Sequence, residues 1–255
     1  MPELPYSLDR TVLIRATREI VFRYFTDSAR WASWWGAGST IDASPGGRVY
    51  IRHANGAEVS GEVLEVAAPE RIVFTYGYAS GQPMPPGASR VTIDLLPDAA
   101  GTRLHLSHEF GESNARDLHV QGWRFQLSLF GNVVSNEVCA GAQALIDAWY
   151  GVWEMKEAAE RDEILARTVT AAIRFRDRYS LLEGVAEVTA HIAAAQRFMP
   201  GISLRRKGEI RQCQGTALCE WVAEGPDGAV RMSGSSVFEL DQDGRIESVT
   251  GLAGV

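Results

Sequence analysis

Cysteine is scarce in this sequence. The chain of 255 residues has only Cys139, Cys213 and Cys219. A sparse, odd set of cysteines argues against a disulfide framework and indicates reduced thiols. Cys213 and Cys219 are six residues apart, which matches no common zinc-ligand spacing. We therefore predict neither a bound metal nor a cofactor.

The sequence also lacks long apolar runs and a recognisable leader. No apolar stretch approaches the ~20 residues that a membrane-spanning helix needs. The N-terminal segment MPELPYSLDR has no basic patch followed by an apolar stretch, as a secretory signal would have. These absences predict a cytoplasmic protein without a membrane partner.

An excess of basic charge is missing as well. The formal net charge is −7, and residues 1–140 and 141–255 each contain more acidic than basic residues. A protein that binds a phosphate backbone normally presents a basic surface. We therefore expect no nucleic-acid partner.

The pattern of apolar residues predicts two α+β domains. From residue 47 to 110 apolar residues alternate with polar ones, which predicts strands, and residues 117–140 then form one apolar helix that should cover the sheet. The second half begins with helices and ends with strands at 202–211, 215–224, 229–240 and 245–252. Helices followed by a strand meander indicate α+β and not parallel α/β. We predict domains at 1–140 and 141–255, joined near residues 139–143.

Several segments of the first half match a known family in order. They are VFRYFTD, WWG, PGG, GEVLEV, PERIVF, GTRL and GW, which begin at residues 21, 34, 45, 61, 69, 101 and 122. With them the first domain resembles the activator-of-heat-shock-protein-ATPase homologues of the START-like (SRPBCC) superfamily. The resemblance implies a helix-grip fold, in which an antiparallel sheet curls around a long C-terminal helix with a cavity between them.

Weaker cues in the second half also occur in a consistent order. They are Trp149-Tyr150, FRD at 175–177, EG at 183–184, Trp221, Gly234 and DGRI at 243–246. The second domain thereby resembles the SnoaL-like branch of the cone-shaped nuclear-transport-factor-like fold. The resemblance implies a pocket in the cone and leaves open a homodimer formed through this C-terminal domain.

Aromatic residues are the candidate ligand contacts of the first domain. Aromatic rings can line a cavity for a flat apolar ligand, with tyrosine hydroxyls and tryptophan N–H groups as orienting donors. Ordinary core packing is the alternative for each of them. The candidates are Trp34, Trp35, Tyr50, Tyr76, Phe110 and Trp123.

Two histidines in the first domain do not suggest catalysis. His105 and His108 are three residues apart in a predicted strand, so they should point to opposite faces of the sheet. One metal ion could not be held by both, and we interpret them as structural or exposed residues.

The second domain has candidates for acid–base chemistry. A carboxylate at an apolar pocket can have a raised pKa and remove a proton next to a carbonyl. Asp177 resembles in position the base of the steroid isomerases that share the fold, and His191 is a second candidate base. The isomerases' oxyanion-binding tyrosine falls near Trp153 here, with Tyr150 one turn away. A structural role for Asp177 remains the alternative, since Arg176 and Arg178 flank it. The predicted ligand contacts of this domain are Trp149, Tyr150, Trp153 and Trp221.

Three functions follow from these residues. The first is binding of a small apolar or amphipathic molecule, polyketide-like or aromatic. The second is an enzyme of the cyclase, isomerase or hydratase type that uses Asp177 or His191. The third, based on the family resemblance of the first domain, is a co-chaperone-like module for protein interaction.

Overall fold

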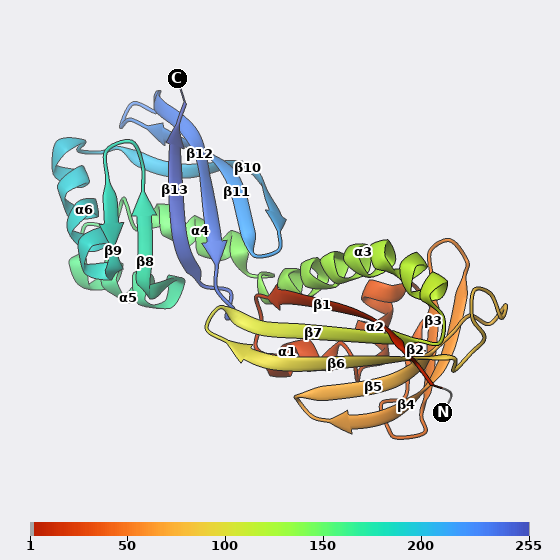
Figure 1. The fold of residues 1–255 in the computed structure, drawn as a ribbon. Helices are drawn as coiled ribbons and strands as arrows, with labels where there is room; N and C mark the ends of the chain where they lie inside the picture. Colours follow the sequence, from red (N-terminus) through yellow and green to blue (C-terminus); the bar gives the residue numbers. More distant parts are fainter. Residues whose placement is uncertain (1–2, 255) are drawn as a thin grey trace. The chain divides into compact units, whose positions relative to one another are not determined.

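The computed structural model describes residues 3–254. The chain divides between Ser135 and Asn136 into two compact units. Each unit combines one sheet with three helices, so the predicted α+β class is confirmed (Figure 1). No helix within residues 3–254 is long and apolar enough to cross a membrane.

The first unit is built on a seven-stranded sheet in which all neighbouring strands are antiparallel. Its order is β1-β7-β6-β5-β4-β3-β2, so the first strand lies beside the last. Strand β1 pairs with β7 from Tyr6 onward. The strands are β1 (Tyr6–Ile14), β2 (Thr40–Ile41), β3 (Arg48–Arg52), β4 (Glu58–Ala67), β5 (Arg71–Tyr76), β6 (Ser89–Asp98) and β7 (Gly101–Phe110).

A long helix, α3 (Ser113–Val138), carries the apolar face that the sequence predicted over 117–140. Two short helices, α1 (Arg18–Arg23) and α2 (Ser28–Trp35), precede it along the chain. The side chain of Asp27 caps α2 by accepting from the backbone N–H of Arg30 at 2.8 Å. These helices bury aromatic side chains against the sheet, which is the helix-grip arrangement.

The second unit contains a six-stranded sheet of order β10-β11-β12-β13-β8-β9. All pairs are antiparallel except β13 with β8, which is parallel. The sequence did not predict β9, which has only three residues. The strands are β8 (Val169–Arg176), β9 (Leu181–Glu183), β10 (Ser203–Cys213), β11 (Thr216–Glu224), β12 (Val230–Leu240) and β13 (Ile246–Ala253).

Three helices complete the second unit: α4 (Ala142–Gly151), α5 (Ala158–Thr168) and α6 (Gly184–Phe198). Helix α4 contacts β10, while α5 and α6 contact β8 (Figure 1). Their apolar faces and the inner face of the sheet form one core around Ile146, Ile173 and Phe238. The core leaves a cavity at the C-terminal end of α6.

Candidate functional site

A cavity in the second unit has a volume of about 540 Å³. Ligand pockets typically have volumes of roughly 300–1,000 Å³. All six residues predicted for this domain contribute to its wall. They are Trp149, Tyr150, Trp153, Asp177, His191 and Trp221.

Aromatic rings form much of the wall. Trp149 and Trp153 lie one turn apart, in and just after α4, with ring centroids separated by 6.2 Å. Phe175 of β8 packs against both, at 5.8 Å from Trp149 and 5.9 Å from Trp153. Trp221 of β11 lies opposite Gly234 of β12, where the missing side chain leaves room for its indole ring. A wall of this kind suits a flat apolar ligand.

Asp177 follows the last residue of β8 and begins the turn to β9. Its Oδ1 accepts from the backbone N–H of Tyr179 at 2.8 Å, and its own N–H donates to the carbonyl oxygen of Ser180 at 3.0 Å. This Asx turn fixes the carboxylate at the edge of the cavity. The side chain is half-buried, so one part of it stays in contact with solvent.

His191 projects from the middle of α6. Its imidazole lies between Phe175 and Trp153, with centroid distances of 5.9 and 5.7 Å. Nε2 lies 3.4 Å from Oγ of Ser180, in the same turn that holds Asp177. The fold therefore brings both predicted bases to one cavity, and their catalytic use stays a prediction.

Tyr150 supplies a phenol to the same cavity. Its hydroxyl lies 3.5 Å from Sγ of Cys219, whose strand neighbour Ser236 also lines the cavity. Burial raises the pKa of Tyr150 far above its ordinary value, and the hydrogen bond with Cys219 raises it further. The hydroxyl thus stays protonated at neutral pH and can donate a hydrogen bond. The sequence comparison had placed an oxyanion-binding tyrosine near Trp153, one turn from Tyr150.

Trp153 has an unused donor. Its Nε1 is buried and has no hydrogen-bond partner among residues 3–254. An indole N–H can only donate, so a bound molecule with an acceptor oxygen would satisfy it. This donor follows from the fold alone, since sequence spacing does not show which indole lacks a partner.

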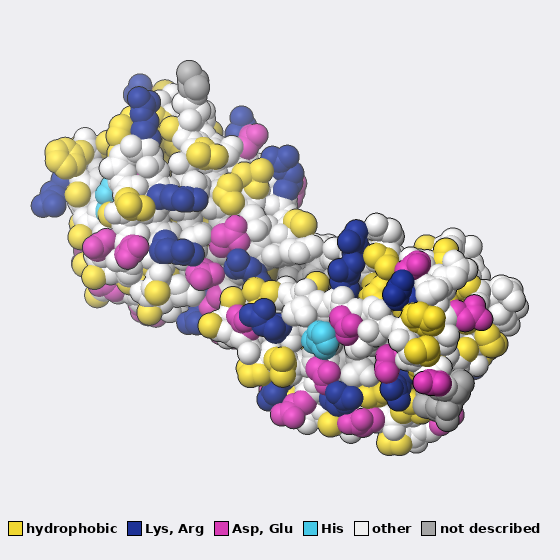
Figure 2. Space-filling model, viewed as in Figure 1, with side chains coloured by type: hydrophobic (Ala, Val, Ile, Leu, Met, Phe, Trp, Pro, Cys, Tyr) yellow, Lys and Arg dark blue, Asp and Glu magenta, His cyan; other side chains and the backbone are white. Residues whose placement is uncertain are grey.

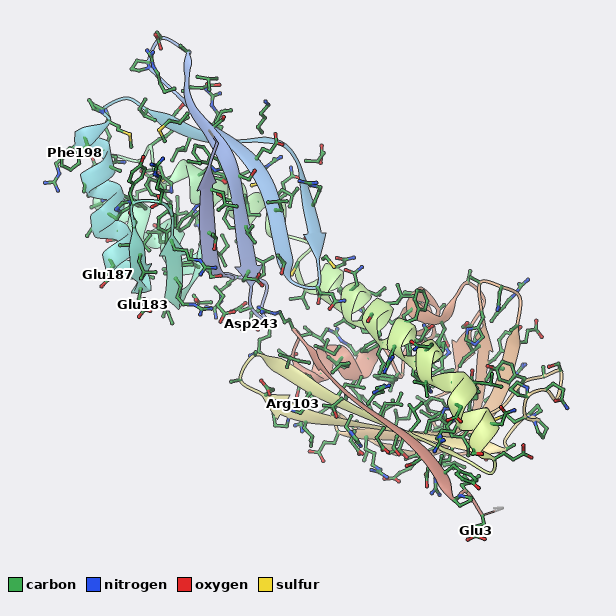
Figure 3. All side chains as sticks on the ribbon, turned by 45° about the horizontal axis from the view of Figure 1, so that its top comes forward. Glu3, Arg103, Glu183, Glu187, Phe198 and Asp243 are labelled. Carbon is green, nitrogen blue, oxygen red and sulfur yellow. The ribbon has the colours of Figure 1, made fainter. Side chains whose placement is uncertain are left out.

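The rim of the cavity is apolar and exposed. Phe198, labelled in Figure 3 at the end of α6, is 85% exposed. Tyr179 is 79% exposed. Met199 and Met232 complete this part of the rim. Figure 2 shows hydrophobic side chains interspersed with Lys and Arg over the second unit. The cationic side chains at the cavity are Arg178 and Arg231, of which Arg231 pairs with Asp227 at 2.6 Å.

The six aromatic residues predicted as ligand contacts of the first unit fall into two groups, and only the second group lines a cavity. Trp34 is packed among Phe25, Trp31 and Phe130, and Phe110 lies fully buried against His108. Tyr50 donates its hydroxyl to Glu58 at the exposed surface, at 2.9 Å. Trp34 and Phe110 are therefore core-packing residues, and Tyr50 is a surface residue.

The remaining three, Trp35, Tyr76 and Trp123, line a cavity of about 310 Å³. His53, Tyr78 and His119 line it too, although the sequence analysis did not single them out. His119 precedes Trp123 by one helical turn, so the core face of α3 could have indicated it. His53 lies in the loop between β3 and β4, and no periodic signal marks it.

His108 lies behind this cavity and is fully buried, whereas His105 is half-exposed near Asp9. The opposite orientation predicted from their spacing is therefore confirmed. Burial lowers the pKa of His108 well below its ordinary value, and the nearby His119 lowers it further. No group of three or more potential metal ligands occurs in the part of the chain that the structure describes.

Comparison with known proteins gives a family match for the first unit. Residues 15–134 match the family model described as activator of Hsp90 ATPase homolog 1-like protein, which confirms the resemblance of the first unit. A search of curated proteins finds no match.

Solved structures similar to this chain include three from different bacteria. A SnoaL-like family protein from Agrobacterium tumefaciens str. C58 has 22% identity and a TM-score of 0.43, covering 44% of this chain and 97% of that chain. CalU16 from Micromonospora echinospora has 25% identity and a TM-score of 0.43, covering 57% and 86%. The Aha1 dimer from Colwellia psychrerythraea has 15% identity and a TM-score of 0.42, covering 48% and 90%.

Proposed function

We propose that the chain is a two-domain small-molecule-binding protein, with domains at 1–140 and 141–255, whose principal ligand occupies the cavity of the second unit. The observation that carries this proposal is the cavity of about 540 Å³ with its wall of aromatic rings. The expected ligand is apolar or amphipathic, either polyketide-like or aromatic. Its polar end would meet polar groups of the cavity such as Asp177, Arg178 and His191.

The test begins with native mass spectrometry of the freshly purified full chain, to detect a co-purifying small molecule. Fluorescence titration with 1-anilinonaphthalene-8-sulfonate then measures binding of an aromatic amphipathic probe. Ala194 lines the cavity, so A194W should fill it and weaken binding of this probe at least tenfold. Ala190 is exposed on the same helix, and A190W is the matched control that should bind like the wild type. Equal affinity of both variants would contradict binding in this cavity.

An acid–base enzyme is the second candidate, supported by the presence of Asp177, His191 and the Tyr150 hydroxyl at one cavity. In this reading the base takes a proton from the carbon next to a carbonyl, and Tyr150 donates a hydrogen bond to the oxygen that becomes negative. Such a donor in a water-poor site stabilises the enolate. Return of the proton at another carbon would complete an isomerisation.

Proton exchange separates the two candidates without knowledge of the natural substrate. The protein would be mixed with 2-tetralone in D₂O, and loss of the C1 proton signal followed by NMR. Catalysis predicts exchange above the buffer rate that D177N or H191Q abolishes even at saturating 2-tetralone. Exchange at the buffer rate would remove the enzyme hypothesis and leave the binding proposal intact.

Three further points stay predictions. The second unit presents exposed apolar side chains on β12 and β13, Val230 and Leu252, which support a homodimer formed through the C-terminal domain. Sedimentation that gives only monomer at micromolar concentration would contradict it. The other two are predictions made from the sequence: a cytoplasmic location, and a co-chaperone-like role of the first unit.

A further inference from the structure

A second cavity of the second unit, of about 420 Å³, adjoins the larger one described above. We call it the α6–β10 cavity, because it lies between the loop after α4, the C-terminal end of α6 and the start of β10. Asp177 and His191 line only the larger cavity, so a group bound in the α6–β10 cavity meets different polar residues. The residues that line both cavities are Trp153, Ala195, Met199, Ile202 and Leu204.

The wall of the α6–β10 cavity holds polar groups without partners. Glu154 and Lys156 line it from the loop after α4, and both are exposed. Neither forms an ion pair in the part of the chain that the structure describes. Nε1 of Trp153, on the shared wall, is buried and has no acceptor among residues 3–254. An ammonium group and an indole N–H are therefore available to a bound molecule.

A buried cation lies directly behind this wall. Arg161 of α5 is only 4% exposed, and its Nη1 donates to the carbonyl oxygen of Met155 at 3.0 Å and to Oε1 of Gln196 at 3.4 Å. Gln196 lines the α6–β10 cavity, and its Nε2 donates to the carbonyl oxygens of Trp153 and Met155 at 2.9 and 2.8 Å. Nε of Arg161 is buried without a partner, and within residues 3–254 no carboxylate pairs with this guanidinium.

The balance of these charges favours an anion in the α6–β10 cavity. A buried guanidinium normally has an anionic partner, because removal of an unpaired charge from water is costly. Water screens the exposed charge of Glu154 much more than the buried charge of Arg161. Lys156 adds a second positive charge at the wall itself. A carboxylate would offset these charges, and its oxygens can accept from Nε1 of Trp153.

We propose that the α6–β10 cavity binds the carboxylate group of an amphipathic acid, whose apolar body contacts the wall shared with the larger cavity. Lys156 pairs with the carboxylate, and Nε1 of Trp153 donates a hydrogen bond to one of its oxygens. The inference deepens the proposed function and rests on it, since it names the chemical class of the ligand as an amphipathic carboxylic acid. The carboxylate lies away from Asp177, which has the same sign of charge and lines only the larger cavity. An uncharged polar group at the other end of the ligand can still meet Asp177 and His191.

The first test compares two probes by isothermal titration calorimetry of the full chain at pH 7. The probe is 6-phenylhexanoate, and the comparator is 6-phenylhexanamide, which has the same apolar body without the charge. The carboxylate should bind roughly fivefold more tightly than the amide, as expected for an ion pair that water partly screens. K156Q should remove this preference. K207Q is the matched control and should keep it, because Lys207 is exposed on β10 and does not line the cavity.

The second test uses the fact that Lys156 and Lys207 are the only two lysines of the chain. Reductive methylation with ¹³C-formaldehyde keeps the positive charge of each lysine and gives each a separate NMR signal, and K156Q assigns them. Saturating 6-phenylhexanoate should shift the signal of Lys156 and leave that of Lys207 unchanged, whereas the amide should shift neither. This measurement is made on the wild-type chain, so it decides the matter even if K156Q does not fold.

The outcomes separate this inference from the proposed function. Equal affinity for the two probes, or a Lys156 signal that does not move at saturating 6-phenylhexanoate, overturns the carboxylate site. If 1-anilinonaphthalene-8-sulfonate still binds and A194W still weakens it, the proposed function stands although this inference has failed. If neither that probe nor 6-phenylhexanoate binds at millimolar concentration, both fail together.

Discussion

The indole N–H of Trp123 donates to Nδ1 of His108 across 2.9 Å, from helix α3 to strand β7. Because Nδ1 accepts, the neutral imidazole carries its proton on Nε2, which lies 2.8 Å from Oγ of Ser89. Ser89 in turn donates to the carbonyl oxygen of Tyr76 at 2.8 Å. The chain of hydrogen bonds fixes one tautomer of a histidine that is fully buried.

This arrangement makes the stability of the protein depend on pH. Burial lowers the pKa of His108 and of His119, so the unfolded chain takes up protons at a pH where the folded protein does not. The stability contributed by the neutral imidazoles is therefore complete above the ordinary histidine pKa and is lost as pH falls below it. We expect the free energy of unfolding to fall by about 1.4 kcal/mol per pH unit for each such histidine.

Urea unfolding between pH 8 and pH 5 measures this dependence. H119Q should flatten the profile, because it removes one of the three histidines whose pKa burial lowers, His53, His108 and His119. H105Q is the control, since His105 lies half-exposed on the opposite face of β7, and it should keep the wild-type slope. A wild-type profile that stays level down to pH 5.5 would show that these histidines are not held neutral.

The two histidines of β7 also show what the sequence could and could not reveal. Strand alternation correctly placed His105 and His108 on opposite faces, because the period of a strand is a local property. His119 lies on the core face of α3, which the helical period marks. The approach of His53 to the same region depends on how the β3–β4 loop packs on the sheet. Tertiary packing of this kind leaves no periodic signal in the chain.

The second unit gives the same lesson for the site. Trp149, Tyr150 and Asp177, which were chosen through the resemblance to a known fold, do line one cavity. The Asx turn at Asp177 and the short strand β9 were missed, since three residues are too few for a recognisable alternation. The absence of a partner for Nε1 of Trp153 depends on every neighbouring atom, and only the structure supplies those.

Gly122 and Gly61 should respond in opposite ways to alanine. Gly122 lies inside α3, where a Cβ meets nothing and the glycine costs backbone entropy, so G122A should stabilise the protein by about 0.5–1 kcal/mol. At Gly61 of β4 a Cβ would lie 1.8 Å from the carbonyl oxygen of Thr75, so G61A should destabilise it. Thermal unfolding measures the change in stability of each variant. A change of the same sign in both would contradict the packing described for the two glycines.

The three thiols should react in two classes. Cys213 is exposed, whereas Cys139 and Cys219 are buried, and burial raises the pKa of Cys219. A thiol with a raised pKa supplies little thiolate, which is the reactive form. With Ellman's reagent at pH 8 we expect one equivalent to react rapidly and the other two only in urea. C213S should remove the rapid phase entirely, and a rapid phase that persists in this variant would disprove the assignment.

The contact between Gly234 and Trp221 should control both stability and ligand binding in the second unit. A Cβ at residue 234 would lie 2.2 Å from the carbonyl oxygen of Leu252 and 2.6 Å from Cζ2 of Trp221. The carbonyl belongs to the neighbouring strand β13, so only a shift of the sheet or of the indole ring could relieve the overlap. G234A should therefore lower the free energy of unfolding by about 1–3 kcal/mol, the usual cost of overpacking.

Because Trp221 forms part of the cavity wall, the same substitution should weaken binding of 1-anilinonaphthalene-8-sulfonate under conditions where the variant is still folded. Ser235 is the matched control, since its side chain points to the other face of β12, and S235A should change stability by less than about 0.5 kcal/mol. Chemical denaturation and the probe titration are measured on the same preparations. If G234A loses stability but binds the probe as the wild type does, the indole ring of Trp221 is not part of the binding surface.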